Sequence, residues 1–76
     1  MSVSHASPEI DGAKLRERRK LAGLSVSDAA LKMGISITYL SAIERGHRRT
    51  VAPATYVRIC DALDVKDRSE LLKAAA

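Results

Sequence analysis

The chain has 76 residues, of which 46% are hydrophobic, and its 13 basic and 9 acidic side chains give a formal net charge of +4. This length suits one domain with a small core, and the single cysteine excludes an intrachain disulfide and a cysteine-based metal cluster. No stretch approaches the roughly 18 to 20 apolar residues of a membrane span, so we expect a cytoplasmic protein that does not contact a membrane, and we expect no metal and no cofactor.

The basic side chains are unevenly distributed along the chain. Residues 1–60 hold ten basic and five acidic side chains, whereas residues 61–76 hold three basic and four acidic ones. This distribution indicates a basic body that faces a polyanion and a near-neutral end that contacts protein. A basic surface that only meets solvent is the alternative on charge alone.

Residues 1–9 are predicted to form a flexible N-terminal lead-in, because the Ser-rich start of the chain has no apolar period. A single domain is predicted over residues 10–76. Its first helix is expected over residues 10–22, where apolar positions such as Leu15 lie among charges and Gly23 follows the end.

Two further helices are predicted to follow in close succession. Ser25 offers its hydroxyl to the first N–H groups of a helix that Gly34 ends, since glycine accepts a left-handed conformation. Ser36 is expected to cap the next helix, over residues 37–45, and Gly46 to close it.

The C-terminal part is predicted to add two more helices. Pro53 suits the first turn of a fourth helix that runs to about Leu63, with Cys60 packed in the core. A short fifth helix is expected over residues 68–75. The sequence shows no strand pattern, so the predicted fold is all-α with five helices.

The second and third predicted helices form a recognisable pair. Two helices joined by a short turn that contains glycine are typical of the DNA-binding helix-turn-helix. Ala29 and Ala30 are small enough to let the two helices approach, and Gly34 permits the tight turn. Leu40 and Ile43 are expected to anchor the pair to the core.

Five groups of residues carry a family resemblance: Leu15-Arg16-Glu17 with Arg19, Gly23-Leu24-Ser25, Gly34-Ile35-Ser36, Tyr39-Leu40-Ser41 with Ile43-Glu44-Arg45-Gly46, and Ala62-Leu63-Asp64-Val65. Through them, residues 12–72 resemble the phage Cro and CI repressor type of helix-turn-helix, also called the XRE family. The resemblance implies a compact, five-helix, lambda-repressor-like DNA-binding domain of bacterial or phage origin, with the third helix in the major groove.

By this resemblance, four side chains of the third helix contact base edges: Ile37, Thr38, Ser41 and Ala42. Ile37 and Ala42 are able to touch only thymine methyl groups, whereas Thr38 and Ser41 offer single hydrogen bonds. None of the four has an amide or a guanidinium for bidentate contacts, so we expect modest direct readout supplemented by DNA shape. The alternative for Ile37 is a place in the core.

Seven side chains are expected at the DNA backbone: Ser25, Ser27, Ser36, Tyr39, Arg45, Arg48 and Arg49. The family often has Gln where this chain has Val26, which offers a phosphate no hydrogen bond, so the serines and the N–H groups of the helix start remain for that contact. Arg48 or Arg49 is also suited to a narrow minor groove. The alternative is that the loop arginines only meet solvent.

Arg19 and Glu44 match a family pair that joins the first and third helices as a partly buried salt bridge. Their expected role is structural. Removing one partner would leave the other charge desolvated, so Arg19→Ala is expected to lower stability more than Lys20→Ala.

A lone module of this size makes few phosphate contacts and is expected to bind weakly at physiological salt. By the resemblance, two copies pair through their C-terminal helices and place their recognition helices about 34 Å apart on a palindromic operator. The expected interface residues of this homodimer are Tyr56, Val65, Leu71 and Leu72.

Together these observations favour a sequence-specific transcriptional regulator that binds double-stranded DNA, in the simplest case a dimeric repressor. A restriction-modification controller protein is a second interpretation in the same class, and an antitoxin whose main partner is a toxin protein is one from another class. An enzyme is not expected, because no Ser, His and carboxylate cluster is placed on a pocket.

Overall fold

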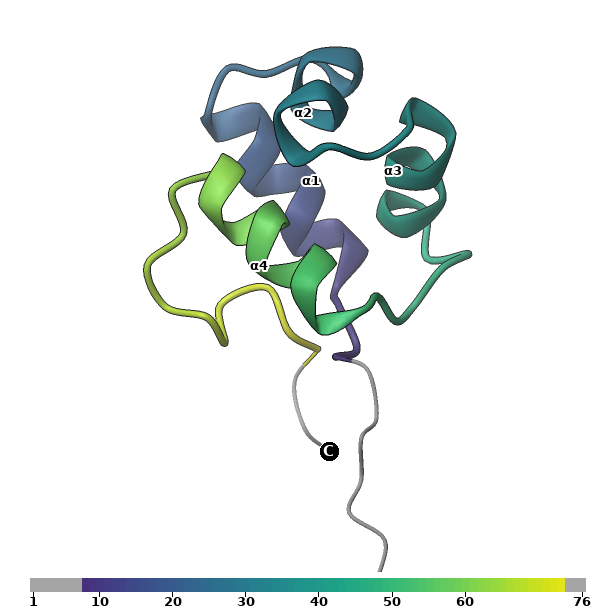
Figure 1. The fold of residues 1–76 in the computed structure, drawn as a ribbon, viewed down its shortest axis with the longest axis vertical. Coiled ribbons are helices and arrows are strands. Elements are labelled where there is room, and N and C mark those ends of the chain that lie inside the picture. Colours follow the sequence, from purple (N-terminus) through teal and green to yellow (C-terminus); the bar gives the residue numbers. More distant parts are fainter. Residues whose placement is uncertain (1–7, 74–76) are drawn as a thin grey trace, which may run out of the picture.

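The computed structural model describes residues 8–73, and this part of the chain contains four α-helices (Figure 1). They are α1 (Gly12–Leu21), α2 (Val26–Met33), α3 (Ile37–Glu44) and α4 (Pro53–Ala62). The first four predicted helices are therefore confirmed to within two residues at each end. The predicted fifth helix is wrong: residues 68–71 form turns, and residues 74–75 lie outside the described part.

Local hydrogen bonds set where the first three helices begin. Before α1, the Asp11 carboxylate accepts from the N–H groups two and three residues later, at 3.0 and 3.2 Å. Before α2 and α3, the hydroxyls of Ser25 and Ser36 each accept from the N–H group three residues later, at 3.1 and 3.0 Å. Helix α4 has no such side-chain cap, and Pro53 occupies its first turn, where a missing N–H group costs little.

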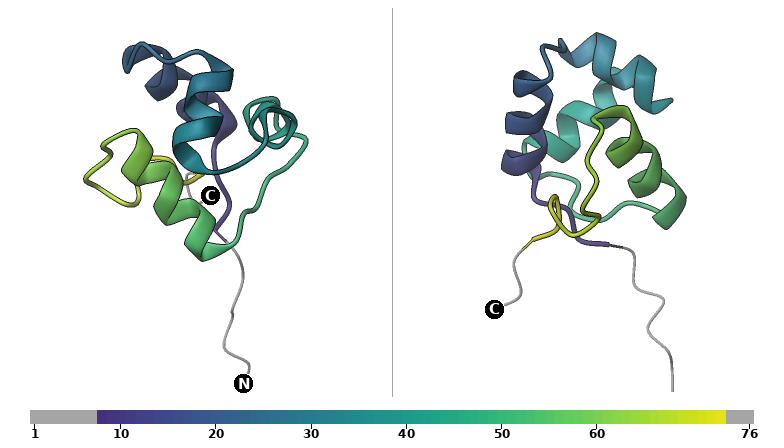
Figure 2. Two further views of the ribbon diagram at one scale, coloured as in Figure 1. Left: turned by 45° about the horizontal axis from the view of Figure 1, so that its top comes forward. Right: turned by 90° about the vertical axis from the view of Figure 1, so that its left-hand side faces the viewer.

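The helices pack in a connected arrangement in which α2 contacts both α3 and α4, and α1 contacts α3 (Figure 2). Helices α1 and α3 meet at Gly12 without a side chain between them. A Cβ atom at Gly12 would overlap the carbonyl oxygen of Ile43 and lie 2.9 Å from that of Glu44. Only glycine fits this contact between two backbones.

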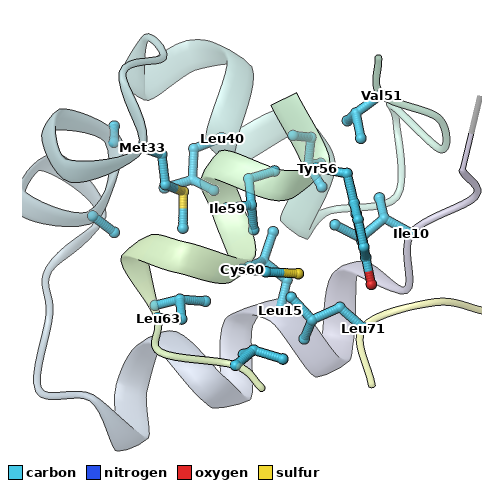
Figure 3. Packing of buried hydrophobic residues seen from close by; sticks show 14 residues of the cluster. Ile10, Leu15, Met33, Leu40, Val51, Tyr56, Ile59, Cys60, Leu63 and Leu71 are labelled. Atoms are coloured by element: carbon cyan, nitrogen blue, oxygen red, sulfur yellow. The ribbon is translucent and has the colours of Figure 1, made fainter. Parts of the chain in front are cut away.

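One core of buried hydrophobic side chains joins all four helices (Figure 3). Its members are Ile10, Leu15, Ala29, Ala30, Met33, Leu40, Ile43, Val51, Tyr56, Ile59, Cys60, Leu63, Val65 and Leu71. Cys60 is fully buried, as predicted. Exposed large hydrophobic side chains include Leu21, Leu31 and Val57.

Residues 63–73, here called the closing segment, return the chain to its own beginning (Figure 1). The N–H group of Asp11 donates to the carbonyl of Leu71 at 2.8 Å, and that of Lys73 donates to the carbonyl of Glu9 at 2.9 Å. These two long-range bonds give the closing segment backbone partners where a fifth helix was predicted. The N–H group of Ile10, between Glu9 and Asp11, donates instead to the carbonyl of Arg49 at 2.8 Å. Residues 1–7 of the predicted lead-in lie outside the described residues.

Candidate nucleic-acid interface

The turn between α2 and α3 has the geometry of a tight helix-to-helix connection. Gly34 ends α2 with φ 72°, in the left-handed region that glycine adopts without a Cβ penalty. The N–H group of Ile35 then donates to the carbonyl of Ala30 at 3.0 Å, which closes the end of α2 before Ser36 caps α3. Two capped helices with a turn of three residues form a helix-turn-helix.

The four predicted base-contacting side chains lie along one side of α3. Ile37 is 51% exposed, so the alternative that it belongs to the core is excluded. Thr38 is exposed, whereas Ser41 and Ala42 are half-buried. Leu40 and Ile43 of the same helix are fully buried. Helix α3 therefore has one side packed in the core and an opposite side that is accessible from solvent.

The serines predicted at the DNA backbone surround the starts of α2 and α3. Ser25, Ser27 and Ser36 are all exposed. The hydroxyls of Ser25 and Ser27 lie 3.3 Å apart, and Ser25 and Ser36 also accept the capping bonds described above. A hydroxyl that accepts one bond still has its own proton to donate, so these groups suit a phosphate oxygen.

The basic loop after α3 is tied to α3 itself. The N–H groups of His47 and Arg48 both donate to the carbonyl of Ala42, at 2.9 and 3.1 Å. The guanidinium carbon of Arg48 lies 5.1 Å from the centre of the Tyr39 ring, within the range of a cation–π contact. The side chains of Arg45, Arg48 and Arg49 are exposed. The loop thus presents three cations beside α3 in a position fixed by backbone bonds.

Arg19 and Glu44 connect α1 to the end of α3. Nε and Nη2 of Arg19 lie 2.7 and 3.0 Å from the two carboxylate oxygens of Glu44, and Nη1 donates to the carbonyl of Leu24 at 2.9 Å. Only 9% and 6% of the two side chains are exposed. The hydrogen bonds that Arg19 donates to Glu44 raise the pKa of Arg19, against the opposing effect of burial. A bidentate pair of this kind holds α3 in orientation relative to α1.

A hollow of about 270 Å³ lies between α1, α2 and α3, and Arg16 on its rim is a residue that the sequence analysis missed as a site residue. The hollow is lined by Arg16, Arg19, Val26, Ser41, Glu44 and Arg45. Arg16 precedes Arg19 by three residues, which places both on the same side of α1. That spacing is the signal in the sequence that identifies Arg16 as a neighbour of α3.

Most of the residues predicted at a dimer interface are buried in the core of a single copy of the chain. Tyr56, Val65 and Leu71 are 5%, 5% and 0% exposed and belong to the core, while Leu72 is half-buried. Their burial follows from the fold of the closing segment, which turns inward instead of forming a helix. A second copy therefore finds little of these side chains at the surface.

Tyr56 and Cys60 are the buried titratable groups beneath the closing segment. The Tyr56 hydroxyl donates to the carbonyl of Arg68, so it fastens the closing segment to α4. Burial raises the pKa of Tyr56 to about 12, with a contribution from its neighbour Cys60. Burial also raises the pKa of the Cys60 thiol, so this cysteine is not an activated nucleophile.

Two further properties of residues 8–73, membrane crossing and metal binding, depend on the length of the helices and the grouping of ligand side chains. No helix of this part has the length and apolar character needed to cross a bilayer. The same residues contain no cluster of three or more His, Cys, Asp or Glu side chains that would suit a metal ion.

The fold and this surface define a class of protein, the helix-turn-helix DNA-binding module. The helix-turn-helix family HTH_3, the Cro/CI or XRE type, matches residues 15–71. The chain therefore belongs to this family, and it is a DNA-binding transcriptional regulator and not an enzyme. No curated protein sequence matches the chain.

Solved structures of regulators share the fold. The chain is 33% identical to the restriction-modification controller protein C.AhdI from Aeromonas hydrophila, over 79% of this chain and 89% of that one, with a TM-score of 0.72. It is 29% identical to the N-terminal DNA-binding domain of SinR from Bacillus subtilis, over 86% and 94%, with a TM-score of 0.73. A structure of SinR in complex with DNA is 33% identical over 72% and 87%, with a TM-score of 0.69.

Proposed function

We propose that this protein is a repressor that binds a palindromic operator as two copies, with α3 of each copy in a major groove. The observation that carries the proposal is the division of α3 into a fully buried side and an exposed side that begins with Ile37 and Thr38. Because the exposed side makes no contribution to the core, its side chains are free to meet base edges.

The proposed contacts with bases and with the DNA backbone follow from the chemistry of each side chain. Ile37 and Ala42 contact thymine methyl groups, and Thr38 and Ser41 make single hydrogen bonds to bases. Ser25, Ser27, Ser36, Tyr39, Arg45, Arg48 and Arg49 contact the DNA backbone. The cation–π contact at 5.1 Å between Tyr39 and Arg48 supports this assignment, because it holds a flexible guanidinium beside α3 before DNA arrives.

Selection of preferred sites from random DNA, followed by binding measurements at several salt concentrations, tests the proposal. Thr38→Ala is expected to relax the preference at one position of each half-site, whereas Ser27→Ala weakens binding to all sequences alike. Arg48→Ala is expected to reduce the slope of log affinity against log salt by about one. A Thr38→Ala protein that selects the same sites with the same stringency would contradict the role given to α3.

Two copies are proposed because one module makes few phosphate contacts, and affinity at physiological salt depends on their number. The selected sites are expected to contain two inverted half-sites with centres one helical turn, about 34 Å, apart. Sedimentation of the complex should give two chains per duplex. An asymmetric site that binds one chain would refute the dimeric arrangement and leave the assignment of α3 intact.

A controller of a restriction-modification system is a second candidate, favoured by the 33% identity to C.AhdI over 89% of that chain. The genomic location of the selected operator separates the two candidates. An operator upstream of endonuclease or methyltransferase genes supports the controller, and one upstream of unrelated genes supports a repressor of another system.

A further inference from the structure

We propose that the hollow between α1, α2 and α3 holds one phosphate of the bound DNA, with Arg16 and Arg45 as its cationic contacts. The inference rests on the proposed function and extends it, because it makes α1 part of the DNA-binding surface. It also assigns a role to Arg16, which lies outside the helix-turn-helix itself.

The charge in the hollow favours an anion. Four of its six lining side chains are charged, and Arg19 with Glu44 form a bidentate pair that leaves no net charge between them. Arg16 and Arg45 take part in none of the ion pairs found in residues 8–73. The hollow therefore carries two positive charges without a carboxylate partner. Charges that line a concave surface attract an anion more strongly than the same charges on a flat one.

The size and wall chemistry suit a phosphodiester group. The volume of about 270 Å³ is several times the roughly 30 Å³ that one water molecule occupies in the liquid, so the hollow has room for a phosphate with its four oxygens. Ser41 supplies a hydroxyl on one wall, and the apolar Val26 forms another. Val26 has no polar group for the anion, so the side-chain hydrogen bonds would come from Arg16, Arg45 and Ser41.

The position of the hollow links it to the exposed side of α3. Ser41 and Arg45 line the hollow and also belong to the residues proposed to meet bases and backbone. A phosphate in the hollow would therefore belong to the strand that borders the groove entered by α3. Arg16 would contact this strand from α1, on the opposite side of the hollow from α3.

The first test compares Arg16→Ala with Lys14→Ala, which removes one positive charge from the same helix. Lys14 is exposed and lines a different hollow, with Glu17, Arg18, Leu21 and Glu70. Binding is measured on a duplex selected from random DNA by the unaltered protein, over a range of potassium chloride concentrations. Arg16→Ala is expected to weaken binding on the order of tenfold and to lower the salt slope by about one, with Lys14→Ala close to the unaltered protein. Arg16→Lys should keep the slope, because it keeps the charge.

The second test locates the phosphate. Neutral methylphosphonate groups are placed one at a time along the duplex, and the affinity of each is measured with both proteins. At one phosphate of each half-site the unaltered protein should lose clearly more affinity than Arg16→Ala, which keeps only Arg45 and Ser41 as contacts. Thermal melts by circular dichroism establish that each variant is folded.

The possible outcomes distinguish a failure of the phosphate site from a failure of the proposed DNA-binding function. If the unaltered protein binds with a steep salt slope and Arg16→Ala matches Lys14→Ala, or if Arg16→Ala and the unaltered protein lose the same affinity at every phosphate, the phosphate site is refuted and the repressor proposal stands. If the unaltered protein shows no salt-dependent binding to any duplex, the proposed function itself fails.

Discussion

The helix-turn-helix, residues 25–46, and the closing segment, residues 63–73, are held in shape by different means. In the helix-turn-helix, serine caps and left-handed glycines lie within a few residues of the backbone groups that they serve. In the closing segment, the partners are more than 50 residues away along the chain, at Glu9, Ile10 and Asp11. Both regions contribute to the core, the first through residues such as Leu40 and Ile43 and the second through Leu63, Val65 and Leu71. The proposed DNA-binding surface belongs to the first region, so the closing segment is expected to affect stability more than recognition.

Leu71→Ala is the most severe test of that separation. Leu71 is fully buried, and removal of a buried leucine side chain costs about 4 kcal/mol in the free energy of unfolding, a large share of the stability of a domain this small. Urea denaturation measures the loss, and Leu31→Ala, at a residue that is 82% exposed, is the control. DNA affinity measured in the cold, where the variant is folded, should change little. A stability equal to that of Leu31→Ala would show that the closing segment is not part of the core.

Arg19→Ala probes the buried ion pair that joins α1 to α3. Its loss leaves the Glu44 carboxylate buried without a partner, which is expected to cost about 3 kcal/mol of stability. Lys20→Ala, at the exposed neighbouring position, should be close to neutral. Equal melting temperatures for the two variants would mean that the helix-turn-helix holds its orientation without the pair.

Most of the fold was predictable because its signals are local. Ser25, Gly34 and Ser36 set the ends of α2 and the start of α3 by bonds that span only a few residues, so the helix-turn-helix is readable from the sequence. The conformation of the closing segment was not predictable in this way, because two adjacent leucines near the end of a chain are compatible with a helix as well as with a turn. Which of the two forms depends on backbone partners at residues 9–11, and no local pattern reveals them.

The candidate site divides in the same way. The exposure of Ile37 and Thr38 follows from the helical period that buries Leu40 and Ile43. Arg16 was missed because its neighbours Ser41 and Arg45 come together with it only when α1 packs on α3. Of the residues predicted at a dimer interface, Val65 and Leu71 are buried in one copy of the chain because the closing segment turns inward, and no local pattern in the sequence shows that turn.

Tyr56→Phe tests the hydrogen bond that joins the closing segment to α4. Loss of the hydrogen bond to the Arg68 carbonyl is expected to cost about 1 kcal/mol at neutral pH. The pKa of Tyr56 is raised to about 12 in the folded protein, so its contribution is complete below pH 10 and is lost as the pH rises from about 10 to 12. Unfolding measured over this range should show the unaltered protein losing stability relative to Tyr56→Phe. Parallel curves for the two proteins would exclude this role of the hydroxyl.

Asp67→Ala should have the smallest effect. The N–H group of Ser69 and then its hydroxyl donate to the Asp67 carboxylate and lower its pKa from 3.8. A lowered pKa stabilises the folded protein above about pH 4, and this contribution is lost as the pH falls further. The variant is therefore expected to be slightly less stable than the unaltered protein at pH 7, and the difference in stability should shrink as the pH falls below about 4. A difference that does not shrink at low pH would point to a role other than charge.

The contact at Gly12 has a consequence for any attempt to change which DNA the protein prefers. Because main-chain atoms of α1 and α3 approach each other directly there, backbone packing limits the tilt of α3 at this point whatever rotamers the neighbouring side chains adopt. New side chains grafted onto the outer positions of α3 would inherit this tilt unchanged. Altered specificity should then follow from chemistry at those positions alone, with no need to redesign the scaffold beneath them.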